Sequence, residues 1–268
     1  MILSKSGTIS FKYCNYSFFG VRLKHLVAYI TTGFPEKSFT VDLALALGEN
    51  GVDSLELGVP FSDPVADGPV IEKANFLALE KGLRFKDVLE ISEQIAPKVD
   101  TLWMGYFNSF YQYGMDALLK KASEIGVSGM IIPDLPHEEA LLYRAQFDAN
   151  NIANIAFVAP TDSDARIEEI VRDAKKFIYL VAYAGITGSG QSEDLQPVLR
   201  SIKSYTDTPA YVGFGVNPKT AKEKVVGADG VIVGSAFVNV LLQEELTLSQ
   251  KIEQCCAIAS EIKQKINE

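Results

Sequence analysis

The stretch LELGVPFSDPVADGP, residues 55–69, places a charged residue inside a short apolar run and follows it with a loop of prolines, glycines and acids. Glu56 lies between two leucines, whereas Asp63 and Asp67 follow in a segment too rich in Pro and Gly to form a helix. A short apolar run that ends at turn residues is typical of a strand buried on both faces. We therefore expect a buried strand that carries Glu56 and opens into an acidic loop.

Similar apolar runs recur along the chain and alternate with longer segments of helical periodicity. Eight runs are expected to form strands, at residues 26–31, 54–58, 101–106, 128–133, 154–160, 177–183, 209–215 and 230–234. After one of them, Asn217 is expected to cap a helix that has Pro218 at its first position. Eightfold alternation of strand and helix favours an α/β fold of the (β/α)8 TIM barrel type, with a doubly wound open sheet as the alternative.

The length of the chain suits one such barrel. It has 268 residues, 47% of them apolar, and no Pro/Gly/Ser linker divides it. We expect residues 1–268 to form a single (β/α)8 barrel domain. Residues 1–20 are apolar but interrupted by Lys12, and they form neither a signal-peptide core nor a membrane-length span. We interpret them as an atypical N-terminal extension.

Charge and cysteine content narrow the class of function. A net charge of −9 and a pI of about 4.9 argue against binding to nucleic acid or to an anionic membrane surface. Cys14, Cys255 and Cys256 have the spacing of neither a disulfide framework nor a metal site, and His25 and His137 are too few to indicate one. The sequence therefore predicts a cytoplasmic protein without a bound metal.

Glycine-rich segments follow the last three expected strands: GITGSG (185–190), GFG (213–215) and GSA (234–236). Loops at the carboxyl ends of barrel strands build the active site, and small residues there let backbone N–H groups approach an anion, here beside a helix that begins near Ser235. The alternative is that these glycines only form caps and turns. Because the chain has neither a complete dinucleotide fingerprint nor a P-loop lysine, a phosphorylated small substrate is favoured over a nucleotide.

Glu56 is the strongest candidate for proton transfer. Its neighbours in the strand point outward, so its side chain is expected to face the barrel mouth, where burial would raise its pKa toward neutrality. The alternative is a structural Glu paired with a Lys or Arg. Asp67 is placed to face the same cavity. The strand runs contain no lysine for Schiff-base chemistry, and the aromatic residues Tyr29, Tyr106 and Phe214 are expected to line an apolar pocket.

These motifs together resemble the tryptophan synthase α subunit family. The resemblance rests on residues 55–69, on AYITTGFP upstream, and on GITG, GFG and VGSA in order downstream, and it extends from about residue 26 to 242. It implies retro-aldol cleavage of indole-3-glycerol phosphate to indole and D-glyceraldehyde 3-phosphate, the penultimate chemistry of L-tryptophan biosynthesis. The chain would then be a carbon–carbon lyase that works by carboxylate acid/base catalysis.

The resemblance also implies roles for individual residues. Glu56 matches the general acid/base, and Asp67 matches the carboxylate that holds the indole N–H. Tyr179 matches a tyrosine near the catalytic Glu, and Thr187 matches a threonine of the active-site lid. The positions that match phosphate-binding residues are Gly188, Gly215, Gly234 and Ser235. One departure is Ala182-Tyr183, where the family often has a Ser-Arg pair.

The family resemblance further implies a partner. We expect an α2β2 heterotetramer in which only the β chain binds pyridoxal phosphate, and in which the FSDP turn (61–64) and Asn108 face that chain. Two alternatives remain at this point. One is a weakly active regulatory α-like subunit that mainly activates a β partner. The other is a different phosphate-binding barrel lyase or isomerase.

Overall fold

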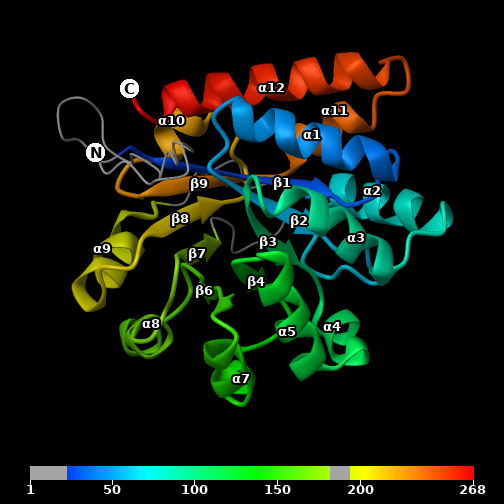
Figure 1. The fold of residues 1–268 in the computed structure, drawn as a ribbon. Helices are drawn as coiled ribbons and strands as arrows, with labels where there is room; N and C mark the ends of the chain where they lie inside the picture. The colour runs from blue at the N-terminus through cyan, green and yellow to red at the C-terminus, as the bar shows by residue number, and fades with distance from the viewer. Residues whose placement is uncertain (1–22, 182–193) are drawn as a thin grey trace, which may run out of the picture.

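The computed structural model describes residues 23–181 and 194–268, so the extension expected at residues 1–20 lies outside the described residues. The described residues form nine parallel strands with helices packed around them (Figure 1). The strands are β1 (His25–Thr31), β2 (Ser54–Gly58), β3 (Asp100–Met104), β4 (Gly129–Ile131), β5 (Ala153–Asn154), β6 (Ala156–Val158), β7 (Ile178–Val181), β8 (Ala210–Gly213) and β9 (Gly230–Val233).

The sheet closes through an interrupted strand. Its order is β5-β4-β3-β2-β1-β9-β8-β7-β6, and its two end strands are consecutive in the chain, separated only by Ile155. β5 pairs with β4, the Ile155 N–H still donates to the Met130 carbonyl, and β6 pairs with β7. The single strand expected over 154–160 is therefore divided between two neighbours. The (β/α)8 TIM barrel is confirmed, and the doubly wound alternative is wrong.

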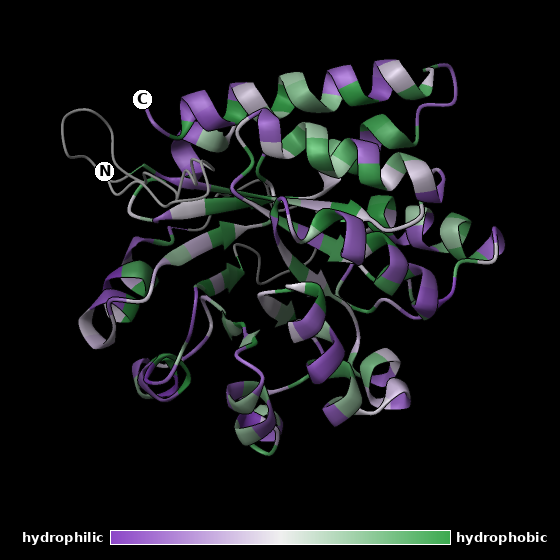
Figure 2. Cartoon of the chain, in the orientation of Figure 1, coloured by the Kyte–Doolittle hydropathy of each residue, from purple (hydrophilic) through white to green (hydrophobic). Residues whose placement is uncertain are grey.

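Helices cover the outside of the barrel. They are α1 (Lys37–Glu49), α2 (Pro69–Glu80), α3 (Phe85–Ile95), α4 (Phe107–Tyr113), α5 (Met115–Ile125), α6 (His137–Leu141), α7 (Arg144–Ala149), α8 (Asp164–Val171), α9 (Gln196–Tyr205), α10 (Ala221–Lys224), α11 (Ser235–Leu241) and α12 (Leu248–Lys265). In Figure 2, hydrophobic and hydrophilic colours alternate along the helices, as expected of helices with one buried face. No helix in the described ranges is long and apolar enough to span a bilayer.

Alternation along each strand separates two apolar layers. Leu55 and Leu57 of β2 belong to the outer cluster, between strands and helices, and both are fully buried. Residues that point inward form a second cluster inside the barrel, which includes Val27, Leu102, Ile131, Phe177, Tyr211 and Ile232. Because successive strand residues face opposite sides, Glu56 must point into the barrel. It is in register with Tyr29 on β1 and with Leu102 on β3.

The segment after β8 differs from its expected form. The Asn217 carbonyl accepts from the N–H groups of Thr220 and Ala221, and its side chain accepts from the Lys219 N–H at 2.8 Å. Asn217 therefore caps the turn at residues 218–220, whereas the N-cap of α10 is Thr220, so the expected helix with Asn217 as its cap and Pro218 at its first position is wrong. The helix that follows, α10, has only four residues because the chain returns to the barrel at β9.

Candidate active site

A cavity of about 640 Å³ opens at the carboxyl ends of the strands. Eight of the residues singled out in the sequence line it: Tyr29, Glu56, Asp67, Tyr179, Phe214, Gly215, Gly234 and Ser235. Two others, Thr187 and Gly188, lie outside the described residues, as does the Ala182-Tyr183 pair. The carboxylates, the aromatic residues and the glycine loops thus meet at one cavity, which is the arrangement expected of a barrel enzyme.

Glu56 is a buried acid, and one of its two carboxyl oxygens is unpaired within residues 23–181 and 194–268. Its side chain is 2% exposed, and its Oε1 atom has no hydrogen-bond partner among the described residues. Burial and the nearby charge of Asp67 raise the pKa of Glu56 to about 8. No Lys or Arg among the described residues pairs with Glu56, and its pKa is raised rather than lowered, which argues against the alternative of a structural Glu paired with Lys or Arg. At neutral pH this carboxyl group holds a proton that it can donate into the cavity.

Asp67 is held in place by side chains from two other elements. Asn75 on α2 donates from Nδ2 to Asp67 Oδ2 at 3.0 Å, and the Tyr106 hydroxyl also hydrogen-bonds to the carboxylate. Burial raises the pKa of Asp67 to about 6, although these two hydrogen bonds lower it. Asp67 is therefore mostly ionised at pH 7, while Glu56 is mostly protonated. The cavity thus contains one proton donor and one anion.

Tyr106 lies behind the acidic loop, and the residues that line the cavity do not include it. Its hydroxyl accepts a hydrogen bond from the Ala66 N–H at 3.0 Å, and its ring stacks on Phe61 with 5.2 Å between centroids. Its side chain is 1% exposed. Tyr106 therefore supports the Asp67 loop and connects it to the FSDP turn, in which Ser62 and Asp63 are exposed.

Two tyrosine rings enter the cavity over glycines of neighbouring strands. A Cβ atom on Gly58 would lie 2.3 Å from the Tyr29 hydroxyl, and a Cβ on Gly213 would lie 2.3 Å from Tyr179 Cε1. Any side chain at either glycine would displace the ring. Burial raises the pKa of both phenols, with the charge of Asp67 contributing at Tyr29 and that of Glu56 at Tyr179. Both tyrosines therefore stay neutral and present flat surfaces to a ligand.

The opposite end of the cavity is built from backbone. Phe214 and Gly215 follow β8 with φ of 72° and 70°, and Gly234 and Ser235 form the start of α11. The left-handed region is unusual for a residue such as Phe, and such conformations cluster at functional sites. The first N–H groups of α11 have no carbonyl within the helix to donate to. This end of the cavity therefore suits an anion.

Several residues of the site were not anticipated from the sequence. Asn217 and Asn239 add polar groups to the cavity lining, and Phe157 stacks on Tyr179 at 5.0 Å between ring centroids. Asn75 is the most informative, because it is 2% exposed on α2 and lies eight residues after Asp67, which precedes that helix. An Asn on the apolar face of a helix was the available signal, since a buried amide needs a partner.

Comparisons with known proteins agree on one family. A family model described as tryptophan synthase alpha chain matches residues 22–267. The chain is 57% identical over 251 residues to the tryptophan synthase alpha chain of Wolinella succinogenes, covering 93% of this chain and 98% of that relative. It is 39% identical over 223 residues to that of Petrotoga mobilis, covering 81% and 86%.

Solved structures give the same result. A chain of Mycobacterium tuberculosis tryptophan synthase superposes with a TM-score of 0.83 at 32% identity, covering 92% of this chain and 93% of that one. The tryptophan synthase subunit alpha of Campylobacter jejuni superposes with a TM-score of 0.79 at 35% identity, covering 88% and 95%.

Proposed function

Since the chain belongs to the tryptophan synthase alpha chain family, we propose that Glu56 and Asp67 divide the chemistry of its reaction between them. As a carbon–carbon lyase of this family, the chain cleaves indole-3-glycerol phosphate to indole and D-glyceraldehyde 3-phosphate. The observation that carries the assignment of residues is the pair of pKa values in one cavity, about 8 for Glu56 and about 6 for Asp67. One group is an acid and the other an anion at the same pH.

The protonated Glu56 donates to the indole carbon that carries the glycerol phosphate side chain. This step places positive charge on the ring nitrogen, and the Asp67 carboxylate accepts a hydrogen bond from the N–H and stabilises that charge. The bond between the ring carbon and the side chain then breaks, and its electrons restore the aromatic ring. The hydroxyl proton of the side chain returns to Glu56 as the aldehyde forms, so the acid is regenerated.

The rest of the cavity positions the two ends of the substrate. Tyr29, Tyr179 and Phe214 form aromatic walls for the indole ring, with Tyr179 and Phe214 in edge contact at 6.4 Å between centroids. Backbone groups at Gly215, Gly234 and Ser235 bind the phosphate. From the family resemblance, Gly188 adds a phosphate contact and Thr187 helps to close the site. Tyr106 acts by holding Asp67 in place.

Gly234→Val is expected to weaken phosphate binding and to raise KM about tenfold or more. A Cβ at this position would already lie 3.2 Å from Ile71 Cδ1 and 3.5 Å from Tyr29 Cβ, so a branched side chain must extend into the space reserved for the anion. Initial rates against substrate concentration would measure the change. In the parent, inorganic phosphate or glycerol phosphate should compete at millimolar concentration. Absence of competition would place the phosphate elsewhere.

The family acts with a β chain, and we propose an α2β2 heterotetramer in the cytoplasm, with pyridoxal phosphate bound only by that partner. The FSDP turn (61–64), in which Ser62 and Asp63 are exposed, is our candidate contact, together with Asn108 on α4. Phe61 stacks on Tyr106, and Tyr106 contacts both Ala66 and Asp67. Binding of a partner at the turn could therefore shift the loop that carries Asp67 through Tyr106. These contacts support the proposal that binding of the β chain stabilises the catalytically competent conformation of the Asp67 loop.

The purified chain should release indole slowly from indole-3-glycerol phosphate, and its β partner should accelerate release about tenfold or more, or ~1.4 kcal/mol of coupling. The measurement is indole formation while β chain from the same source is titrated in. Turnover by the isolated chain separates the lyase from a purely regulatory subunit, which needs neither Glu56 nor Asp67. A flat response to the β chain would contradict the coupling and leave a stand-alone lyase.

A further inference from the structure

The loop that follows β8 is closed by one hydroxyl group. Thr220 Oγ1 donates to the Gly215 carbonyl at 2.7 Å and accepts from the Asn217 N–H at 3.0 Å. The single proton and a lone pair of this hydroxyl are thus both used within the loop. Thr220 itself does not line the cavity, whereas Gly215, Val216 and Asn217 do. The hydroxyl therefore ties the loop from its outer side.

This tie fixes the direction of a backbone N–H. In a trans peptide the carbonyl and the following N–H point in opposite directions. The Gly215 carbonyl faces Thr220, so the Val216 N–H is directed away from Thr220 and toward the cavity side of the loop. The loop needs such a restraint because Phe214 and Gly215 are both in the left-handed region, which for Phe214 persists only where the surroundings impose it.

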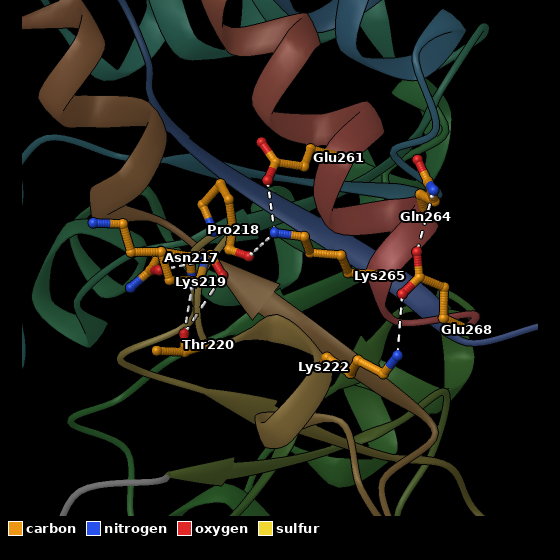
Figure 3. Close-up of polar contacts among 9 residues, drawn as sticks. All are labelled: Asn217, Pro218, Lys219, Thr220, Lys222, Glu261, Gln264, Lys265 and Glu268. Atoms are coloured by element: carbon orange, nitrogen blue, oxygen red, sulfur yellow. Dashed lines mark hydrogen bonds and ion pairs between the residues drawn. The ribbon is translucent and has the colours of Figure 1, made fainter.

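A second tie comes from the far end of the chain. Lys265, near the end of α12, donates from Nζ to the Pro218 carbonyl at 2.7 Å and pairs with Glu261 at 2.7 Å (Figure 3). Its side chain is about one-third exposed, at 34%. Close by, Lys222 pairs with Glu268 at 3.1 Å, but this pair lies at the surface, with Lys222 66% exposed. The two lysines differ because only Lys265 holds a carbonyl of the loop.

We propose that Thr220 and Lys265 are positioning residues for the substrate phosphate, which hold loop 214–218 in the conformation that presents its backbone to the anion. The inference rests on the proposed function, because it takes the phosphate to lie at Gly215. Neither residue touches the substrate. Both act through the loop, so their effect falls on ligands that carry a phosphate and spares ligands that consist of the indole ring alone.

Thr220→Val tests this with little change of shape, since it removes the hydroxyl and keeps the branched side chain. We expect KM for indole-3-glycerol phosphate and the inhibition constant of glycerol phosphate each to rise about tenfold, or ~1.4 kcal/mol. The kcat value and the inhibition constant of indole should stay within about twofold of the parent. Thr220→Ser, which keeps the hydroxyl, should restore the parent values.

Lys265→Met should act in the same direction with a smaller effect, about threefold on glycerol phosphate. Lys222→Met is the matched control, because it removes a neighbouring ion pair that does not hold the loop. Thermal unfolding of every variant would be recorded alongside.

Unchanged glycerol phosphate inhibition in Thr220→Val, or a parallel loss of glycerol phosphate and indole binding, would overturn the inference. Failure of the proposed function would give a different result from failure of this inference. In that case the parent chain itself would neither cleave indole-3-glycerol phosphate nor bind glycerol phosphate. That result would remove both proposals together.

Discussion

Glu56→Gln is expected to lower kcat about 10²–10⁴-fold while leaving the fold intact, the range typical for loss of a general acid/base. Gln has nearly the same shape as Glu but cannot give a proton to the indole carbon or take one from the side-chain hydroxyl. At neutral pH the native Glu56 is mostly uncharged, with a pKa of about 8. The substitution therefore exchanges one neutral buried side chain for another. Single-turnover indole release would measure the loss, and retention of more than half the activity would refute the assignment.

The pH dependence of the stability of Glu56→Gln provides a control for this variant, because it tests whether the native Glu56 is a buried neutral acid. The pKa of Glu56 is about 8 in the folded chain and 4.5 as its ordinary value, so the folded state keeps the proton to higher pH. Stability from this group is therefore fully present below about pH 4.5 and is lost as the pH rises to about 8. Gln does not titrate. Relative to the parent, the variant should be more resistant to denaturant at pH 8 than at pH 5, and an unchanged difference would mean that Glu56 is not buried as a neutral acid.

The sequence was sufficient for the features that depend on local pattern. Glu56 could be identified because a charged residue inside a buried strand is exceptional, and the barrel could be predicted because continuous apolar runs alternate with helical ones. The break of this strand at Ile155 could not be predicted, because the segment NIAFVAP (154–160) contains no residue that interrupts a strand before Pro160. The interruption arises because two different neighbours pair with the two halves of this run.

The roles of other residues in the site depend on tertiary contacts. Tyr106 was expected as an aromatic wall, but the fold places its hydroxyl against the Asp67 loop. Gly58 ends β2 as expected, but its lack of a side chain also makes room for the Tyr29 ring from the neighbouring strand. Asn75 was not singled out in the sequence, where an Asn on an apolar helix face indicates that a buried amide needs a partner but not which partner it has. Each of these depends on which strand or helix lies opposite, and a single sequence does not contain that information.

Asp67→Asn is expected to lower kcat about 10²-fold, with a smaller effect on substrate binding. The variant keeps the shape of the side chain and an oxygen that can accept from Asn75, so the loop should stay in place. What it loses is the negative charge that stabilises the cation on the ring nitrogen, and this charge matters only after Glu56 has donated its proton. The loss should therefore appear in turnover. Weaker binding with unchanged turnover would contradict the role.

The Asp67→Asn variant should also change the pH dependence of the reaction, because the two carboxyl groups interact. The negative charge of Asp67 is one of the two causes that raise the pKa of Glu56 to about 8, the larger being burial. Removing that charge makes ionisation of Glu56 easier, so its pKa should fall. The proton needed by the indole carbon is then lost at lower pH, and the alkaline limb of the kcat/KM profile should move in the acid direction. An alkaline limb at the same pH as in the parent would show that the charge of Asp67 does not affect the pKa of Glu56. The assignment of Glu56 as proton donor and Asp67 as anion would then be wrong.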